Sequence, residues 1–475
     1  MNTFASIIPA PAKIECSNAG EFPLEQISNF HIAEPFKDFA EQIKALFSYF
    51  SYDITTGGSA DTAAWAIIEG PLPPEAFAIE ITPDKVVIKS GSKAGVFYAI
   101  ECLRQMLFAA TISSPKGAVL TCGKLEDAPR FTFRSFHLDS ARHFQSVNVI
   151  KRMLRVMATC RLNTFHWHLV DSQGWRLKLK TTAGLENCFT NTPGYYTTEE
   201  IKEVVDFAAK HHISVIPEID FPGHSRNLLK YLPQYACQNP VSNISEICIG
   251  NPASKEFVKN ILAEVMELFP QSKYIHIGGD EADTANWENC PLCQKSMQEN
   301  NCKDMRELEN IFMRDIAQFV VDNNRQPIIW GTCSGQTYQP ETLVQAWLDI
   351  REPLRVAPNG NKVIYSVHTS LYFDYPANLS EPWETWMFEL SERGVYMTDP
   401  YIIWADKVKD CIIGTEACLW TETVPEWRII PKLLPRIYAY SESAWSDPAN
   451  KDYQDFRRRK ELLEAAGWMD YLTVF

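Results

Sequence analysis

Two adjacent carboxylates follow an apolar run and two glycines in the segment YIHIGGDEAD, residues 274–283. Asp280 and Glu281 would repel each other, and burial of either carboxylate is costly unless a partner compensates its charge. Gly278 and Gly279 allow unusual backbone torsions where the strand ends, so both side chains could face one pocket. Burial and repulsion would then separate their pKa values, with one carboxyl protonated and the other charged, as cleavage of a glycosidic bond requires.

Ionisable and aromatic residues also end the other short apolar runs after about residue 130. Eight such runs alternate with helical stretches: RSFHLDS, NTFHWHLVD, ISVIPEID, YIHIGGDE, QPIIWG, TLVQAWLD, KVIYSVHTSLYFD and CIIGTEACLWTE. Eight strand–helix units predict an α/β fold, a (β/α)8 TIM barrel, in which the chemistry lies at the C-terminal ends of the strands. A doubly wound sheet, the alternative, would need a glycine-rich phosphate turn after an early strand, which the sequence does not have.

The apolar residues between these runs repeat with the period of a helix. This spacing predicts helices around residues 150–157 and 305–324. Thr197 and Glu200 predict a capping box at the start of another helix. The segment 284–304 is expected to be a loop.

The N-terminal part of the chain has a different pattern. Residues 76–91 predict a β-hairpin, because apolar residues alternate on both sides of a Pro-Asp turn. Residues 94–107 predict a helix with an apolar stripe. The polar segment at 124–131 is a plausible boundary. We therefore expect an α+β accessory domain at 1–125 and the catalytic (β/α)8 barrel at 126–475.

The charge and the apolar segments limit the classes of partner. The chain has 475 residues and a net charge of −14, which disfavours nucleic acids and anionic membranes as partners. We expect no membrane span, since no run of about 18 apolar residues occurs. The start of the chain has no secretory signal pattern, which favours the cytoplasm, or the periplasm or the exterior if a leader has been removed. The oligomeric state cannot be read from the sequence.

The cysteines are numerous but do not form a disulfide framework. There are 13, an odd number, and their scattered spacing predicts mostly reduced, buried thiols. Cys290 and Cys293, with Cys302 nearby, are the one cluster that could suggest a metal. A zinc site needs four ligands, and no fourth cysteine or histidine is close in sequence. A local packing cluster is therefore favoured, and we expect no metal or other cofactor.

Two histidines on one predicted strand leave a second chemical interpretation open. His166 and His168, with Asp220 and His224 from the next run, resemble the metal-ligand set of a barrel hydrolase. His168 lies before the end of its strand, which argues against that set. The other interpretation is that the histidines are hydrogen-bonded core residues.

The segment HIGGDEA resembles the signature of glycoside hydrolase family 20, the β-N-acetylhexosaminidases. The tryptophans that end the fifth and sixth runs resemble the same family, as do five further segments in the family's order: PRFTFRSFHLDSARHF, NTFHWHLVDSQGWR, IPEIDFPGHS, LYFD and EACLWTE. The N-terminal AGVFYAIECLRQML resembles the end of the accessory domain that precedes the family's barrel. The resemblance therefore covers almost the whole chain.

This resemblance implies a catalytic group of five residues. Glu281 would be the general acid that protonates the leaving oxygen and then the base that activates water. Asp280 would hold and polarise the substrate's 2-acetamido group, and Tyr372 would hydrogen bond the oxygen of that group. Asp171 and His224 would form a relay behind Glu281.

The resemblance also implies a substrate-binding set, which consists of Arg134, Trp330, Trp347, Asp374, Trp420 and Glu422. In this set Arg134 would clamp the hydroxyls at the far side of the terminal sugar, together with the two carboxylates. The tryptophans would wall the acetamido pocket. Ser172 and Phe373 depart from the usual family residues, but neither has an implied role.

We therefore expect an exo-acting, retaining β-N-acetylhexosaminidase that acts on glycans ending in N-acetylhexosamine. Its substrate's own amide would form an oxazolinium intermediate, with GlcNAc or GalNAc as the terminal sugar. The first alternative is release of a disaccharide such as lacto-N-biose by the same chemistry, which an arginine facing the terminal hydroxyls would block. A non-catalytic carbohydrate-binding protein and a metal-dependent barrel hydrolase are the remaining alternatives.

Overall fold

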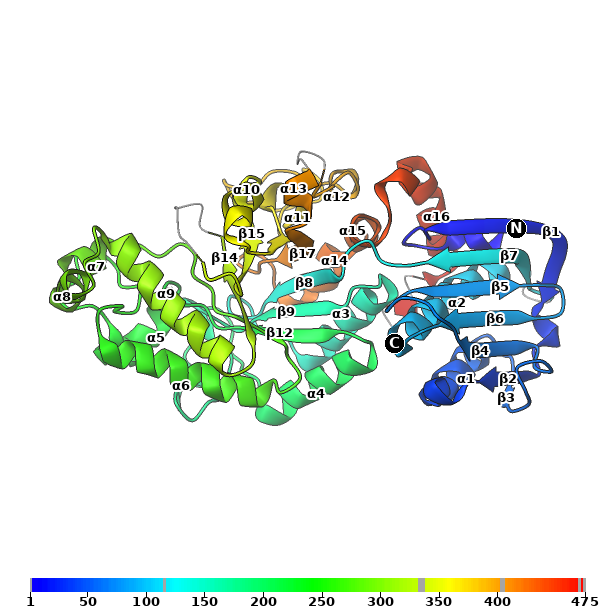
Figure 1. The fold of residues 1–475 in the computed structure, drawn as a ribbon, viewed down its shortest axis with the longest axis horizontal. Helices are drawn as coiled ribbons and strands as arrows, with labels where there is room; N and C mark the ends of the chain where they lie inside the picture. The colour runs from blue at the N-terminus through cyan, green and yellow to red at the C-terminus, as the bar shows by residue number, and fades with distance from the viewer. Residues whose placement is uncertain (1, 114–116, 332–337, 402–405, 469–470, 473–475) are drawn as a thin grey trace. The chain divides into compact units, whose positions relative to one another are not determined.

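The computed structural model describes residues 2–113, 117–331, 338–401, 406–468 and 471–472. The chain forms two compact units (Figure 1). The first contains Met1–Thr132, Arg155–Leu162 and Ile437–Phe475, and the second contains Phe133–Leu154 and Asn163–Arg436. The C-terminal segment after Arg436, which was expected to belong to the barrel domain, is thus part of the first unit. Its helix α16 (Tyr453–Ala465) contacts α2 (Lys93–Ser113) of the same unit.

The first unit contains a seven-stranded sheet in the order β1-β7-β5-β6-β4-β2-β3 (Figure 1). Its strands are β1 (Lys13–Pro23), β2 (Asn29–Ile32), β3 (Thr55–Thr56), β4 (Trp65–Glu69), β5 (Phe77–Ile81), β6 (Val86–Ser90) and β7 (Val119–Asp127). The predicted hairpin is confirmed, because β5 and β6 pair antiparallel with Ile79 opposite Ile88. The predicted helix is α2, which contacts β5, β6 and β7, and α1 (Ala40–Tyr49) is a further helix of this unit. The unit is therefore the smaller α+β domain that the sequence predicts.

Helix α2 is also the most apolar long helix of the described chain. Among the described residues, one segment, Lys93–Ile112, is long and apolar enough to cross a membrane by length and composition alone. Of its apolar window, 89 % is buried inside the protein. This is the burial expected of a core helix in a folded domain.

The second unit contains eight parallel strands that close into a barrel, which confirms the predicted fold class. The strands are β8 (Phe133–Asp139), β9 (Thr164–His168), β12 (Ser214–Glu218), β13 (Tyr274–His276), β14 (Gln326–Trp330), β15 (Leu343–Ala346), β16 (Val363–Tyr365) and β17 (Ile412–Leu419). Seven fall within one of the predicted runs, and β8 begins one residue before its run, at Phe133. Closure of the barrel comes from β17, which pairs with β8, and from β9, which pairs with both β8 and β12. A short antiparallel pair, β10 (Val170–Asp171) and β11 (Gly174–Trp175), follows β9.

Helices alternate with the first five barrel strands (Figure 1). Those between the strands are α3 (Val147–Thr159), α4 (Thr198–Lys210), α5 (Arg226–Tyr231), α6 (Pro252–Leu268), α7 (Ala285–Asn289), α8 (Pro291–Glu299) and α9 (Met305–Asp322). The later ones are α10 (Glu352–Val356), α11 (His368–Leu371), α12 (Glu392–Tyr396), α13 (Asp406–Lys409) and α14 (Ile429–Leu433). The next helix, α15 (Arg436–Trp445), lies in the first unit except for Arg436. The capping box is confirmed, because Thr197 and Glu200 exchange side-chain and backbone hydrogen bonds at the start of α4. The expectation of a loop at 284–304 is wrong, since α7 and α8 lie there.

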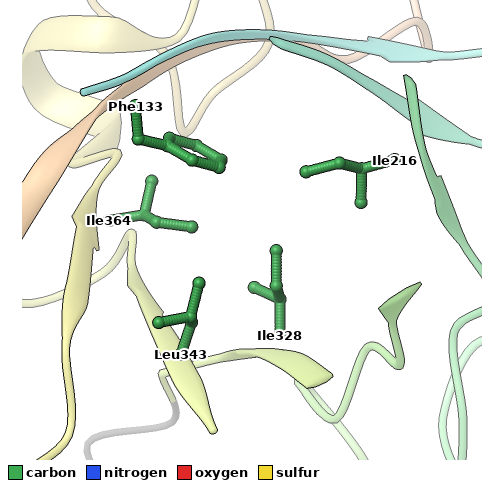
Figure 2. Packing of buried hydrophobic residues seen from close by; sticks show 5 residues of the cluster. All are labelled: Phe133, Ile216, Ile328, Leu343 and Ile364. Atoms are coloured by element: carbon green, nitrogen blue, oxygen red, sulfur yellow. The ribbon is translucent and has the colours of Figure 1, made fainter. Parts of the chain in front are cut away.

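A layer of apolar side chains fills the barrel interior toward the N-terminal ends of the strands. Phe133, Ile216, Ile328, Leu343 and Ile364 come from five strands and point toward one another (Figure 2). Each is at most 4 % exposed. The barrel is therefore a packed core rather than a pore, and any site inside it must lie above this layer, toward the C-terminal ends.

Candidate active site

A buried glutamate occupies the barrel interior above the apolar layer. The Glu218 Oε2 atom lies 2.6 Å from His168 Nδ1 and 3.1 Å from His166 Nε2. Its other oxygen lies 3.3 Å from His276 Nδ1 and accepts a 2.6 Å hydrogen bond from Trp330 Nε1. Burial raises the pKa of Glu218, but the three histidines outweigh burial and hold this pKa well below its usual value. Glu218 is thus a compensated negative charge inside the barrel.

These contacts bear on the metal-ligand set that the sequence left open. His168 hydrogen bonds Glu218 and His166 hydrogen bonds Glu416 at 2.8 Å, whereas Asp220 and His224 hydrogen bond each other at 2.6 Å. In the part of the chain that the structure describes, the four residues do not converge on one point. The two histidines of β9 are hydrogen-bonded core residues.

A chain of polar contacts runs from this buried glutamate to the C-terminal mouth of the barrel. His168 Nε2 lies 3.0 Å from Asp171 Oδ2, and the same oxygen lies 2.8 Å from Arg142 Nη2. Burial favours a raised pKa for Asp171, but Arg142, His224 and His168 together hold it well below its usual range. Asp171 is therefore charged and fixes the guanidinium of Arg142. That guanidinium lies 5.1 Å from the centre of the Trp420 ring and 3.8 Å from Glu422 Oε1.

The structure does not bring Arg134 to this mouth, so its expected role as the clamp on substrate hydroxyls is wrong. Arg134 is the second residue of β8, at the N-terminal end of the strand, and is 0 % exposed. Side chains alternate along a strand, so Arg134 faces away from the interior that Phe133 and His137 share. Arg142, three residues past the end of β8, is the arginine that accompanies Trp420 and Glu422.

Asp220, His224 and Glu281 form a second line of contacts at the mouth. Asp220 Oδ2 lies 2.6 Å from His224 Nδ1, and His224 Nε2 lies 3.4 Å from Glu281 Oε2. The expected relay paired His224 with Asp171, but the carboxylate that hydrogen bonds His224 is Asp220. Asp171 is a near neighbour, with an oxygen within 4.8 Å of the other two groups. Burial lowers the pKa of His224, but Asp171 and Asp220 raise it well above its usual value, so His224 is an imidazolium at neutral pH.

Left-handed backbone torsions make these contacts geometrically feasible. Both contacting residues have positive φ, +49° at His224 and +53° at Glu281. Gly278 has φ +69°, and a Cβ atom there would lie 1.7 Å from the Asp220 Oδ1 atom. An L side chain at position 278 would therefore displace Asp220. The sequence expectation that the two glycines let the strand end bend is consistent with these torsions.

Asp280 and Glu281 have distinct environments although they are adjacent. The Asp280 side chain is 10 % exposed and that of Glu281 is 59 % exposed. Burial and the nearby Asp220 charge raise the pKa of Asp280 well above its usual value, whereas the hydrogen bond to His224 lowers the pKa of Glu281. The pKa values of the pair are split as expected. The raised pKa belongs to Asp280 and the lowered pKa to Glu281, which is the reverse of the order that the implied roles require.

Aromatic rings line the same end of the barrel. The Trp330 ring centre lies 6.5 Å from that of Trp347 and 5.7 Å from that of Trp420. The Tyr372 ring lies 6.2 Å from that of Trp420, and burial raises the pKa of Tyr372 well above its usual value, so its hydroxyl remains a donor. Trp330 is 1 % exposed and forms the base of this wall, while Trp347 and Trp420 are half-buried.

Four buried polar atoms at the mouth have no hydrogen-bond partner within the described structure. They are the acceptors Asp280 Oδ1 and Asp374 Oδ1 and the donors Trp347 Nε1 and Trp420 Nε1. Buried polar groups are nearly always paired, so these atoms are positioned for a polar ligand or for water. Burial and the Glu422 charge raise the pKa of Asp374 well above its usual value. The unpaired atoms and the aromatic rings together suit a ligand with both polar edges and apolar faces.

Comparison with known proteins gives matches over most of the chain. Residues 131–448 match the glycosyl hydrolase family 20 catalytic domain, and residues 5–128 match domain 2 of the same family. A β-hexosaminidase from Akkermansia muciniphila is 31% identical over 408 residues, which cover 81% of this chain and 82% of that protein. A β-N-acetylhexosaminidase from Cellulomonas fimi is 29% identical over 431 residues, covering 85% of this chain and 81% of that protein.

Solved structures agree with these relatives. The GH20 exo β-N-acetylglucosaminidase from Vibrio harveyi, in complex with N-acetylglucosamine, has a TM-score of 0.88 at 26% identity and covers 98% of this chain and 78% of its own. The β-N-acetylhexosaminidase from Bacteroides fragilis has a TM-score of 0.85 at 27% identity, covering 98% of this chain and 96% of its own. The two family domains and the relatives show that this chain belongs to glycoside hydrolase family 20.

Proposed function

We propose that this glycoside hydrolase is an exo-acting, retaining β-N-acetylhexosaminidase that uses the acetamido group of its own substrate as the nucleophile. The family membership supports the hydrolysis of terminal N-acetylhexosamine. The observation that carries the finer proposal is the set of unpaired buried atoms beside Tyr372. Asp280 Oδ1 is an acceptor for the acetamido N–H, and the Tyr372 hydroxyl is a donor for its carbonyl oxygen.

In the first step of the proposed reaction, the acetamido carbonyl oxygen attacks C1 of the sugar. Glu281 gives its proton to the glycosidic oxygen, the C1–O bond breaks and the alcohol leaves. The resulting oxazolinium ion is stabilised by the negative charge of Asp280. Attachment of the nucleophile to the substrate can supply about 7–11 kcal/mol of the barrier, so no enzymic nucleophile is needed.

In the second step, water adds to C1 while Glu281 accepts a proton from it. The bond between C1 and the acetamido oxygen breaks, and the acetamido group is restored. Each step inverts the configuration at C1, so the product keeps the configuration of the substrate. The family is a recognised exception to the scheme with two enzymic carboxylates.

Substrate binding has to reverse the pKa order of Asp280 and Glu281. A hydrogen bond from the acetamido N–H favours the charged form of Asp280, while the sugar covers the exposed Glu281 and raises its pKa. Both carboxylates lie near His224, with Nδ1 4.0 Å from Asp280 Oδ1 and Nε2 3.4 Å from Glu281 Oε2. We infer that the proton of Asp280 is replaced by one on Glu281, with His224 as the intervening group.

Arg142 takes the place of Arg134 in the proposed substrate-binding set. Asp171 holds its guanidinium beside Trp420 and Glu422, where it can bind the hydroxyls of a terminal sugar. Asp374 Oδ1 is a further unpaired acceptor. If Arg142, Asp374 and Glu422 bind the hydroxyls of the terminal sugar, they would block a second sugar on its non-reducing side, which favours exo action over release of a disaccharide.

A substrate panel tests this function. Aryl β-GlcNAc and β-GalNAc should be hydrolysed, and GlcNAc-thiazoline, which resembles the oxazolinium ion, should inhibit. An aryl β-glucoside should be a poorer substrate by at least about 1000-fold, since it has no acetamido nucleophile. Comparable rates for the glucoside would refute substrate assistance, and efficient hydrolysis of an aryl β-lacto-N-bioside would refute exo action.

Substitution of the two adjacent carboxylates tests their roles. Glu281→Gln should lower kcat on substrates with poor leaving groups by about 100- to 10,000-fold and should leave inhibitor binding intact. Asp280→Asn should lower kcat by about 100- to 1000-fold on good and poor leaving groups alike, because it removes the charge that faces the oxazolinium ion. Glu288→Gln, an exposed carboxylate on α7, is the control and should have the activity of the wild type. Equal sensitivity of both variants to the leaving group would contradict these roles.

Substitution of His224 tests, through the pH dependence of kcat/KM, whether His224 holds the proton that Glu281 donates. His224 and Glu281 together hold one proton at neutral pH, and they lose it as pH rises through the raised pKa of His224. In His224→Gln that proton is held by Glu281 alone, and a carboxyl releases its proton at lower pH. The basic limb of the kcat/KM profile should therefore move to lower pH by at least about one unit. An unchanged basic limb would show that His224 is not in the proton path.

A further inference from the structure

Four cysteines converge on one point in the barrel unit, away from the residues of the proposed reaction. Cys237 and Cys248 follow α5, and Cys290 and Cys293 lie at the start of α8. The Cys248 sulfur lies 3.6 Å from that of Cys293 and 3.7 Å from that of Cys290, and the Cys237 sulfur lies 4.0 Å from that of Cys293. All four sulfur atoms lie within 4.8 Å of one another, and all four side chains are buried.

This arrangement differs from the cluster that the sequence predicted. Cys302 was expected beside Cys290 and Cys293, but its sulfur contacts the Asn300 carbonyl oxygen at 3.9 Å and is not in the group of four. Its place is taken by Cys237 and Cys248, which lie 42 to 56 residues before their partners in the chain. Their distance in sequence explains why no fourth ligand was apparent.

The distances have the dimensions of a tetrahedral tetrathiolate centre. A zinc ion with Zn–S bonds of about 2.3 Å places its four sulfurs about 3.8 Å apart. A disulfide would need a separation of about 2.05 Å, and all four cysteines are free thiols. Four soft sulfur ligands in a buried, tetrahedral set favour zinc among common metal ions, with a single iron ion as the chemical competitor.

The backbone around the cluster is adapted to bring the sulfurs together. A Cβ atom at Gly250 would lie 2.4 Å from the Cys293 Cα and 2.5 Å from the Leu292 carbonyl oxygen. Glycine therefore lets the segment that carries Cys248 press against the first turn of α8. Cys290 precedes Pro291 at the start of this nine-residue helix, and Cys293 lies in its first turn.

The cluster joins the loop after β12 to the loop after β13, and other contacts also connect these two loops. Trp287 Nε1 donates a 3.0 Å hydrogen bond to the Ile247 carbonyl oxygen, and Asn286 Oδ1 accepts one of 3.0 Å from the Val241 backbone. The loop after β12 begins near Asp220, and the loop after β13 begins near Asp280. A metal here would therefore fix the loops that carry His224 and Glu281.

We propose that Cys237, Cys248, Cys290 and Cys293 bind one structural Zn²⁺ ion. The four thiols lose their protons on binding, and the ion keeps all four coordination positions filled by sulfur, so it takes no part in hydrolysis. The ion ties the β12 loop to the β13 loop. It is separate from the histidines and carboxylates inside the barrel, and the proposal does not depend on the proposed function.

Metal analysis of the purified full chain tests this site. Mass spectrometry for metals should find about one zinc per chain in the wild type, and titration with an organomercurial should release it. Cys248→Ala and Cys293→Ala should each lose the zinc. Cys302→Ala is the matched control, because it removes a nearby thiol outside the cluster, and it should keep the zinc.

A second measurement keeps the test decisive if the cluster variants fail to fold. Cobalt exchanged into the wild-type protein should give the absorption bands of a tetrahedral tetrathiolate complex. Removal of the metal should lower the Tm by several degrees, as for any ion that binds only the folded state. Absence of stoichiometric metal, stoichiometric iron in its place, a disulfide among the four cysteines, or equal zinc loss in Cys302→Ala would each overturn the proposal.

Discussion

The charge of Glu218 inside the closed barrel is the constraint on which the site depends. An uncompensated carboxylate there would be destabilising by several kcal/mol, so it must be surrounded by donors. His168 and the Trp330 indole each form a hydrogen bond of 2.6 Å with it, and His166 and His276 lie within 3.3 Å. His168 also contacts Asp171, and Asp171 in turn contacts Arg142 at the mouth of the barrel. Glu218 thus holds the indole at the base of the aromatic wall, and Asp171, which His168 links to Glu218, holds the guanidinium near the rim.

Much of the fold could be predicted because its signals are local. Eight apolar runs, the hairpin at 76–91 and the capping box at Thr197 depend on short-range periodicity and hydrogen bonding, and all appear in the structure. The helices α7 and α8 were missed, although Pro291 at the first position of α8 is a helix-start signal. The segment after Arg436 belongs to the first unit because of contacts between segments that are distant in sequence, and the period of apolar residues does not predict such contacts.

The site was predictable in its chemistry but less so in its pairings. The adjacent carboxylates lie together at a strand end as expected, and so do the tryptophans. The prediction that Arg134 binds substrate was wrong. Arg134 is next to Phe133 on β8, and because Phe133 points into the barrel, Arg134 faces away from the interior. His224 contacts Asp220, only four residues earlier in the chain, and has a left-handed backbone torsion that the sequence does not signal. The convergence of Cys237 with Cys293 joins residues 56 positions apart, which no local spacing reveals.

In the proposed reaction, the acetamido oxygen of the substrate attacks C1 of the sugar. The most direct measurement is kcat/KM for a series of aryl glycosides whose N-acetyl group carries zero, one, two or three fluorine atoms. Fluorine withdraws electrons from the carbonyl oxygen and weakens it as a nucleophile, while the leaving group stays the same. The account predicts a steep fall in kcat/KM with each added fluorine. Rates that do not change along the series would contradict it.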